Sequence, residues 1–207
     1  ASGPVSFLHI FDCATDHIKQ GGRRRGANMG VIRVDHPDIM DFINAKRGSG
    51  ALSNFNLSVL VTDAFMRAVR IDERYDLLHP AENRVTQSLR AREVFDAMIE
   101  SAWETGDPGL IFSEAVNQAN PTPQLGPLEA TNPCGEIPLL PFESCNLGSI
   151  NLAHMLHPQD SGQGVDWEKL VNTTRKAVRF LDDVVEVNRY PLPQTEDITR
   201  GNRKIGL

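Results

Sequence analysis

The chain has 207 residues, 40% of them hydrophobic and 23% charged, a composition typical of one folded domain and not of a disordered chain. Its 21 Lys and Arg residues against 27 Asp and Glu residues give a net charge of −6, which argues against a broad basic surface for nucleic acid. No apolar run approaches the roughly 20 residues that span a bilayer, and no signal peptide is recognisable. With only 3 Cys, a disulfide-rich secreted domain is excluded and a reducing, cytoplasmic setting is expected.

Expected strands and helices alternate along the chain, which indicates an α/β fold. In the helix at 90–105, Val94, Met98, Ile99 and Trp103 are expected to share a buried stripe that ends at Gly106. The expected elements are an apolar segment at 4–11 that runs into a helix, a strand at 31–34, a helix capped by Asp35, a strand at 55–61, a helix capped by Thr62, a polar excursion or hairpin at 71–85, the helix at 90–105, a buried strand at 110–112, a loop at 117–141, a strand at 147–152 and a helix from Asp166 to about Asn188.

The most informative segment surrounds Cys134, which has an amide two residues before it and a carboxylate two residues after it. If this tip is extended, Asn132, Cys134 and Glu136 point to the same side and face one pocket. Asn132 can hold a hydroxyl by hydrogen bonds, and Glu136 can take a proton. The thiol of Cys134 can then act as a nucleophile, a metal ligand or a hydrogen-atom shuttle.

The alternative is that Cys134 is a buried structural cysteine in a Pro-rich turn, since a free cysteine usually behaves as a small hydrophobe. A metal site is not predicted, because Cys134 and Cys145 form no Cys-x-x-Cys pair and no His lies close to them in sequence. Cys13 is expected to serve in core or helix packing and not in catalysis.

Residues 132–136 and 143–152 together resemble the active-site finger loop and the following strand of the ribonucleotide reductases, and most of all the adenosylcobalamin-dependent class (class II). Residues 133–136 and 22–29 favour this class over the class that uses a separate metal-bearing subunit (class I). The resemblance implies that residues 1–207 are part of the catalytic domain, without a separate second domain. This domain is a ten-stranded α/β barrel of the ribonucleotide reductase and glycyl-radical type, with the finger loop at its centre.

The resemblance also implies a role for each residue of the finger loop. Cys134 becomes a thiyl radical, Glu136 takes the proton of the ribose 3′-hydroxyl, and Asn132 holds the ribose hydroxyls. Cys145 is one member of a redox pair whose partner lies upstream of Ala1. The residues expected to contact the substrate are Asn132, Pro133, Cys134, Gly135 and Glu136.

A second signal is the Gly- and Arg-rich segment at 19–28, which by composition is either a phosphate-binding nest or a solvated basic turn. It does not fit the Walker pattern GxxxxGK[ST]. By resemblance it is the specificity loop between the allosteric effector site and the substrate base. Its expected residues are Lys19, Gln20, Gly21, Gly22, Arg23 and Arg24.

The implied reaction is the reduction of ribonucleoside diphosphates to 2′-deoxyribonucleotides for DNA synthesis, with adenosylcobalamin as cofactor. The implied partners are dNTP or ATP effectors, a thioredoxin- or glutaredoxin-type reductant and a second copy in a homodimer, but neither nucleic acid nor a membrane. Because the chain begins at Ala1 without Met, we expect an internal piece of a longer protein that is inactive alone. The alternatives are a non-catalytic nucleotide-binding fragment, one piece of a split reductase, or a class I reductase.

Overall fold

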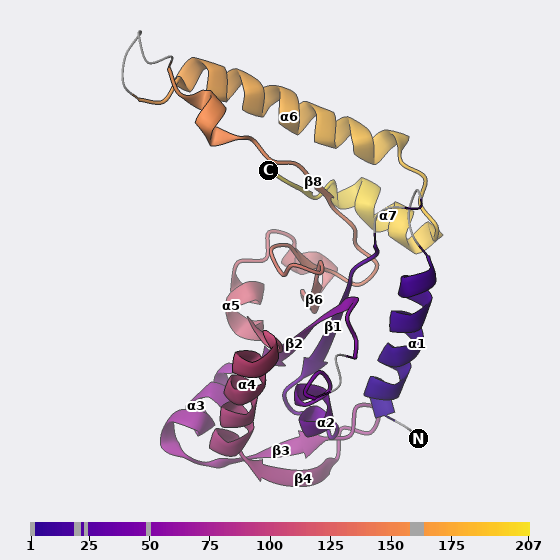
Figure 1. Cartoon of the computed structure of the whole chain (residues 1–207), viewed down its shortest axis with the longest axis vertical. Coiled ribbons are helices and arrows are strands. Elements are labelled where there is room, and N and C mark those ends of the chain that lie inside the picture. The colour runs from indigo at the N-terminus through magenta and orange to yellow at the C-terminus, as the bar shows by residue number, and fades with distance from the viewer. Residues whose placement is uncertain (1–2, 19–21, 23–24, 49–50, 158–163) are drawn as a thin grey trace. The chain divides into compact units, whose positions relative to one another are not determined.

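The computed structural model describes residues 3–18, 22, 25–48, 51–157 and 164–207 (Figure 1). The chain divides into two compact units, Ala1–Leu140 and Pro141–Leu207. Both units contain helices and strands, which confirms the predicted α/β character. The first unit contains α1 (Gly3–His17), β1 (Asn28–Arg33), α2 (Ile39–Ile43), β2 (Phe55–Val61), α3 (Asp63–Ile71), β3 (Arg74–Leu78), β4 (Val85–Arg90), α4 (Ala91–Thr105), β5 (Gly109–Phe112), α5 (Ser113–Gln118), a 3₁₀ turn (Pro123–Leu125), β6 (Ala130–Thr131) and β7 (Pro138–Leu139).

A parallel sheet in the order β1-β2-β5 is the centre of the first unit. Strand β2 lies between the other two, and six of its seven residues are buried, as expected for a parallel strand covered on both faces. Helices α3 and α4 lie side by side, with the sheet between them and α1 (Figure 1). The buried side chains of the sheet and these helices form one apolar core, which includes Ile39, Ile43, Leu57, Val59, Val61, Phe65, Val94 and Met98.

Local signals explain several boundaries in this unit. The Thr62 hydroxyl accepts a hydrogen bond from the Phe65 amide at 3.1 Å, so Thr62 caps α3 as predicted. Strands β3 and β4 form a hairpin, as expected, but it extends to Arg90, beyond the expected range 71–85. Tyr75 on β3 donates its hydroxyl to the Val34 carbonyl at 3.0 Å and packs edge-on against Phe65, and burial raises the pKa of Tyr75.

Other boundaries differ from the prediction. Helix α2 begins at Ile39, with Asp38 and not Asp35 at its N-cap. The Asp35 carboxylate is instead held by the Arg33 guanidinium at 2.6 and 2.9 Å, so it is engaged away from the helix end. The apolar stripe on α4 is also narrower than predicted: Val94 and Met98 are buried, but Ile99 is exposed and Trp103 is 87% exposed.

The second unit contains β8 (Asn146–Leu147), a 3₁₀ turn (Leu152–Met155), α6 (Trp167–Val187), α7 (Pro193–Asn202) and β9 (Ile205–Gly206). Strand β8 pairs in parallel with β9. Asp166 caps α6 by accepting from the Lys169 amide at 2.9 Å, as predicted. The strand expected at 147–152 is shorter, because Asn151 accepts from the Ala153 amide and starts the 3₁₀ turn.

The described strands form one three-stranded sheet and three two-stranded sheets, and no closed barrel is present in this part of the chain. The expected ten-stranded barrel is therefore not confirmed, although the α/β character is. None of the helices in the described ranges has the length and apolar character needed to cross a membrane.

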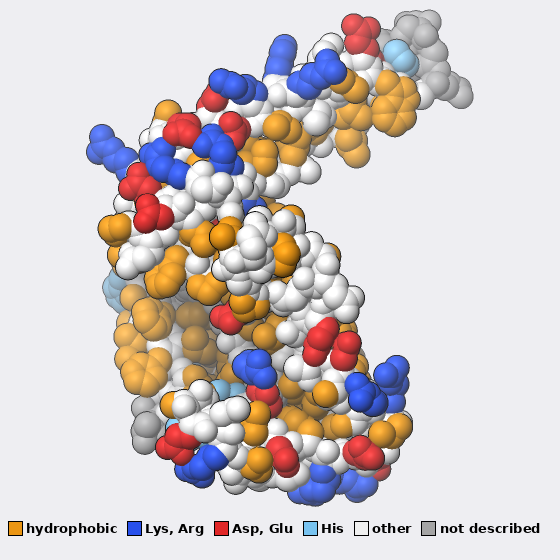
Figure 2. Space-filling view, turned by 180° about the vertical axis from the view of Figure 1, so that it is seen from behind, with side chains coloured by type: hydrophobic (Ala, Val, Ile, Leu, Met, Phe, Trp, Pro, Cys, Tyr) orange, Lys and Arg blue, Asp and Glu red, His pale blue; other side chains and the backbone are white. Residues whose placement is uncertain are grey.

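A cluster of Arg, Asp and Glu side chains joins α6 to α7 within the second unit (Figure 2). Arg203 donates to Asp182 at 2.6 Å and also to Glu186. These hydrogen bonds lower the pKa of both carboxylates below their ordinary values of 3.8 and 4.5. A carboxylate whose pKa is lower in the folded state stabilises the fold above its unfolded pKa, and loses this contribution as the pH falls through the folded value.

We therefore expect the urea concentration at the unfolding midpoint to fall once the pH drops below about 4.5. It should continue to fall until the pH has passed the lowered pKa values of Asp182 and Glu186. In the variant Arg203→Met the unfolding midpoint should fall less over the same acidic range. Arg92→Met removes an exposed pair with Asp96 on α4, in the first unit, and is the control. If the unfolding midpoint falls equally with pH in the wild type and in Arg203→Met, Arg203 is not what lowers the pKa of the two carboxylates.

Candidate functional site

Cys134 lies at the tip of the hairpin formed by β6 and β7. We call residues 132–137 the Cys134 turn. The Gly135 amide donates to the Asn132 carbonyl at 3.0 Å, and the Ile137 amide donates to Asn132 Oδ1 at 3.0 Å. Pro133 follows the first residue of this turn, where its fixed φ is favourable, and Gly135 has a φ of +83°, which glycine adopts without strain. The tip is therefore a closed turn.

This geometry corrects the premise of an extended tip, so Asn132, Cys134 and Glu136 do not alternate as a strand would. Asn132 uses its side-chain oxygen inside the turn, which leaves its Nδ2 group to donate to a ligand. Cys134 and Glu136 are both exposed. The alternative of a buried structural Cys134 is therefore wrong.

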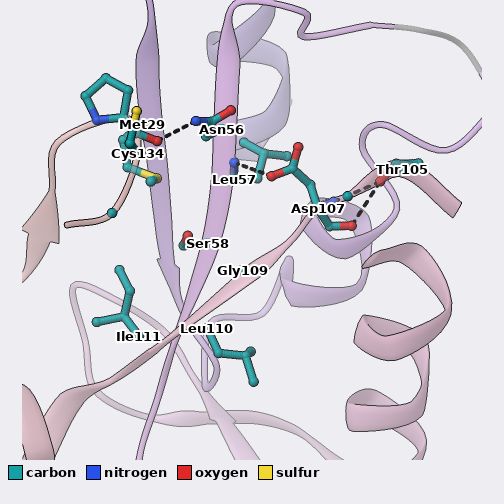
Figure 3. Close-up of a pocket in the computed structure, with 13 residues that line it drawn as sticks. Met29, Asn56, Leu57, Ser58, Thr105, Asp107, Gly109, Leu110, Ile111 and Cys134 are labelled. Carbon is teal, nitrogen blue, oxygen red and sulfur yellow. Dashed lines mark hydrogen bonds between the residues drawn. The ribbon is translucent and has the colours of Figure 1, made fainter. Parts of the chain in front are cut away.

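A cleft of about 550 Å³ lies beside the turn, at the amino-terminal ends of β1, β2 and β5 (Figure 3). Cys134 forms part of its wall, together with Pro133 and Gly135. Asn132 and Glu136 do not line this cleft in the described part of the chain. The arrangement presents one exposed thiol to a space large enough for part of a small-molecule substrate.

One residue of the cleft wall, Asp107, belongs to an ion pair. Lys46 Nζ lies 2.5 Å from Asp107 Oδ2, and both side chains are less than one-fifth exposed. Asp107 Oδ1 accepts from the Leu57 amide at 3.1 Å. Because β5 begins only at Gly109, opposite Ser58, the carboxylate takes the place of a strand partner for that amide.

One side chain connects the sheet to the Cys134 turn. Asn56, on β2, donates its Nδ2 to the Pro133 carbonyl (Figure 3). Asn56, Lys46 and Asp107 were not predicted from the sequence as site residues. The one signal available in the sequence was an Asn within the β-rich segment that forms β2.

Cys145 lies in the second unit, where the chain on either side of it is firmly held. The Glu143 side chain is fully buried and accepts from Lys204 Nζ at 2.6 Å and Asn202 Nδ2 at 2.7 Å. The Ser144 amide donates to Thr199 Oγ1 at 3.2 Å. Cys145 itself is half-buried and carries a thiol, as do Cys13 and Cys134.

The predicted specificity loop falls largely outside the described residues. Within it, Gly22 is exposed and has a φ of +72°. The flanks of the loop are joined by Asp16, which accepts from Asn54 Nδ2 at 3.0 Å and Arg25 Nη2 at 2.9 Å. These hydrogen bonds lower the pKa of Asp16. The residues of the loop that lie outside the described ranges are Lys19, Gln20, Gly21, Arg23 and Arg24.

Cys13 differs from its prediction as a packing residue. It lies on α1 and is exposed. Its carbonyl is within 2.8 Å of His17 Nδ1 one turn further along the helix. Its exposure makes Cys13 useful as a reference thiol in experiments on Cys134.

The sequence of the chain matches a known protein family and several curated proteins. The family model described as "Ribonucleotide reductase, barrel domain" matches residues 1–207. The whole chain is 52% identical to a vitamin B12-dependent ribonucleoside-diphosphate reductase of Thermoplasma acidophilum, of which it covers 27%. It is 53% identical to a protein of the same name from Mycobacterium tuberculosis, of which it covers 30%. The chain thus spans less than a third of the length of these curated relatives.

Proposed function

Because this chain belongs to the ribonucleotide reductase family, through its barrel domain, we propose that it is part of the catalytic chain of a vitamin B12-dependent ribonucleoside-diphosphate reductase. The proposed reaction converts a ribonucleoside diphosphate to the 2′-deoxyribonucleotide. The observation that carries the proposal is the exposed thiol of Cys134, at the tip of a closed turn and in the wall of a cleft.

In the proposed chemistry Cys134 acts as a thiyl radical. It takes the hydrogen atom from C3′ of the ribose, which forms the S–H bond and leaves a radical at C3′. Glu136 takes the proton of the 3′-hydroxyl, and the 2′-hydroxyl leaves as water. A dithiol supplies the second proton of that water, the hydrogen atom that C2′ gains and one further electron, and becomes a disulfide. Glu136 returns its proton to the 3′-oxygen, and Cys134 then returns the hydrogen atom to C3′. The net change is ribonucleotide plus dithiol to deoxyribonucleotide, disulfide and water.

The remaining roles follow from the residues that surround the thiol. Asn132 is proposed to donate from Nδ2 to the ribose hydroxyls, since its Oδ1 is used inside the turn. Pro133 and Gly135 shape the turn that presents Cys134 to the sugar. Cys145 is proposed as one thiol of the redox pair, renewed by a thioredoxin- or glutaredoxin-type protein.

The cofactor proposed for this family member is adenosylcobalamin. Its Co–C bond supplies the first radical of the reaction. An exposed thiol fits this requirement, because the hydrogen atom of a buried thiol could not be reached, and Cys134 is exposed on the cleft wall. Cys13 is exposed as well but does not line the cleft, so Cys134 is the thiol that would receive this radical.

We also propose that the complete protein has the overall architecture of the family. Its strands would complete a ten-stranded barrel around the finger loop, in a homodimer. The loop at 19–24 would lie between the site for dNTP or ATP effectors and the substrate base, so that the bound effector selects which base is accepted. The flanks of that loop are held by Asp16, which supports a loop with fixed ends.

The test uses the full-length reductase that contains this chain. With a ribonucleoside diphosphate, a dithiol and adenosylcobalamin, we expect formation of the deoxyribonucleoside diphosphate, measured by chromatography. Without adenosylcobalamin we expect no product. Turnover that instead requires a separate metal-bearing subunit would assign the protein to the other class, and absence of product under all conditions would reject the proposed function.

A further inference from the structure

We propose that Asn56 is a positioning residue for Cys134: its side chain fixes the orientation of the Cys134 turn against strand β2. This inference rests on the proposed function for its meaning, but the contact itself is independent of that function. Nothing in the sequence pattern around Cys134 points to Asn56, which lies 78 residues earlier in the chain.

The contact acts on the peptide group next to the thiol-bearing residue. Asn56 Nδ2 donates to the carbonyl oxygen of Pro133, and that carbonyl belongs to the peptide bond whose nitrogen is the amide of Cys134. Because a peptide group is planar, a hydrogen bond that restrains its oxygen also restrains the plane that leads to the Cα of Cys134. The hydrogen bond within the turn uses the carbonyl of Asn132 instead, so it does not fix this plane.

Asn56 is itself held on both sides through the backbone. Phe55 and Leu57 point into the core, which directs Asn56 to the opposite face of β2, toward the cleft. Lys46 donates to the Phe55 carbonyl, and Asp107 accepts from the Leu57 amide. The ion pair between Lys46 and Asp107 thus holds the backbone on each side of Asn56.

The chemistry of asparagine suits this role. The acceptor is a carbonyl oxygen, so the partner must donate a hydrogen, which the amide of Asn does and the carboxylate of Asp at neutral pH does not. In Asn56→Asp, a carboxylate oxygen would face the Pro133 carbonyl and repel it at nearly unchanged side-chain volume. The longer Asn56→Gln variant keeps the donor.

The first test is steady-state kinetics on the full-length reductase. For Asn56→Asp we expect kcat to fall about tenfold or more with KM within about twofold, because small misplacement of a reacting group slows the reaction more than it weakens binding. Asn56→Gln should recover part of the lost kcat. Asn44→Asp is the matched control: Asn44 is exposed and donates from Nδ2 to the Met40 carbonyl at 2.8 Å, away from the turn.

The second test needs no turnover. The rate of iodoacetamide alkylation at Cys134, relative to that at Cys13 in the same molecule, is measured by mass spectrometry. We expect Asn56→Asp to change this ratio severalfold, whereas Asn44→Asp leaves it unchanged. An unchanged ratio in Asn56→Asp overturns the proposal, whether or not kcat falls. If the wild type reduces no ribonucleotide, the proposed function fails, while the alkylation ratio still decides the role of Asn56.

Discussion

Replacing Cys134 by Ser is expected to reduce turnover of the full-length reductase to less than about 1% of the wild-type rate while nucleotide binding stays within about twofold. Serine is nearly the same size and preserves the turn. Its O–H bond is much stronger than an S–H bond, so it cannot pass a hydrogen atom to and from C3′ of the ribose. Turnover is measured as deoxyribonucleotide formed, and binding by equilibrium dialysis.

The control for this variant is Cys13→Ser, which removes an exposed thiol from α1. It should retain the wild-type rate. Turnover by Cys134→Ser at more than a few per cent of the wild type would reject the assignment of the thiyl radical. A large loss of nucleotide binding in Cys134→Ser would show instead that the substitution disturbs the site itself.

Replacing Cys145 by Ser should abolish sustained turnover with a thioredoxin-type reductant, a loss of at least about a hundredfold. A hydroxyl cannot form the disulfide that carries away the oxidation, so the dithiol step stops. Hydrogen exchange between solvent and the cofactor should persist, because it requires Cys134 and not Cys145. The two measurements together separate the reductive step from radical formation.

The surroundings of Cys145 provide a matched control. Ser144 packs its hydroxyl 2.9 Å from that of Thr199, next to Cys145 in sequence. Ser144→Ala therefore perturbs the same segment without removing a thiol and should keep most of the turnover. Full turnover in Cys145→Ser would exclude it from the redox pair.

Much of the fold could be predicted because local signals agreed with the tertiary structure. The β-rich segment of β2 and the side-chain caps Thr62 and Asp166 each appear where the sequence places them. Asp35 did not cap a helix, because the nearby guanidinium of Arg33 took its carboxylate. Periodicity on α4 also could not show that Trp103 lies beyond the edge of the core.

The site was predictable in residue identity but not in geometry. The turn residues Pro133 and Gly135 are visible in the sequence, yet the expectation that Asn132, Cys134 and Glu136 face one pocket depends on an extended tip. Asn56 and Asp107 act through contacts that join residues 77 and 50 positions apart in the chain. No local pattern encodes such contacts, so they appear only in the structure.

The central claim is that the thiol of Cys134 exchanges a hydrogen atom with C3′ of the ribose. It is tested most directly with a nucleotide tritiated at C3′. A hydrogen that passes through an exposed thiol can exchange with water, so the wild type should release part of the tritium to solvent during turnover, and Cys134→Ser should release none. No release by the wild type, or equal release by both proteins, would contradict the claim.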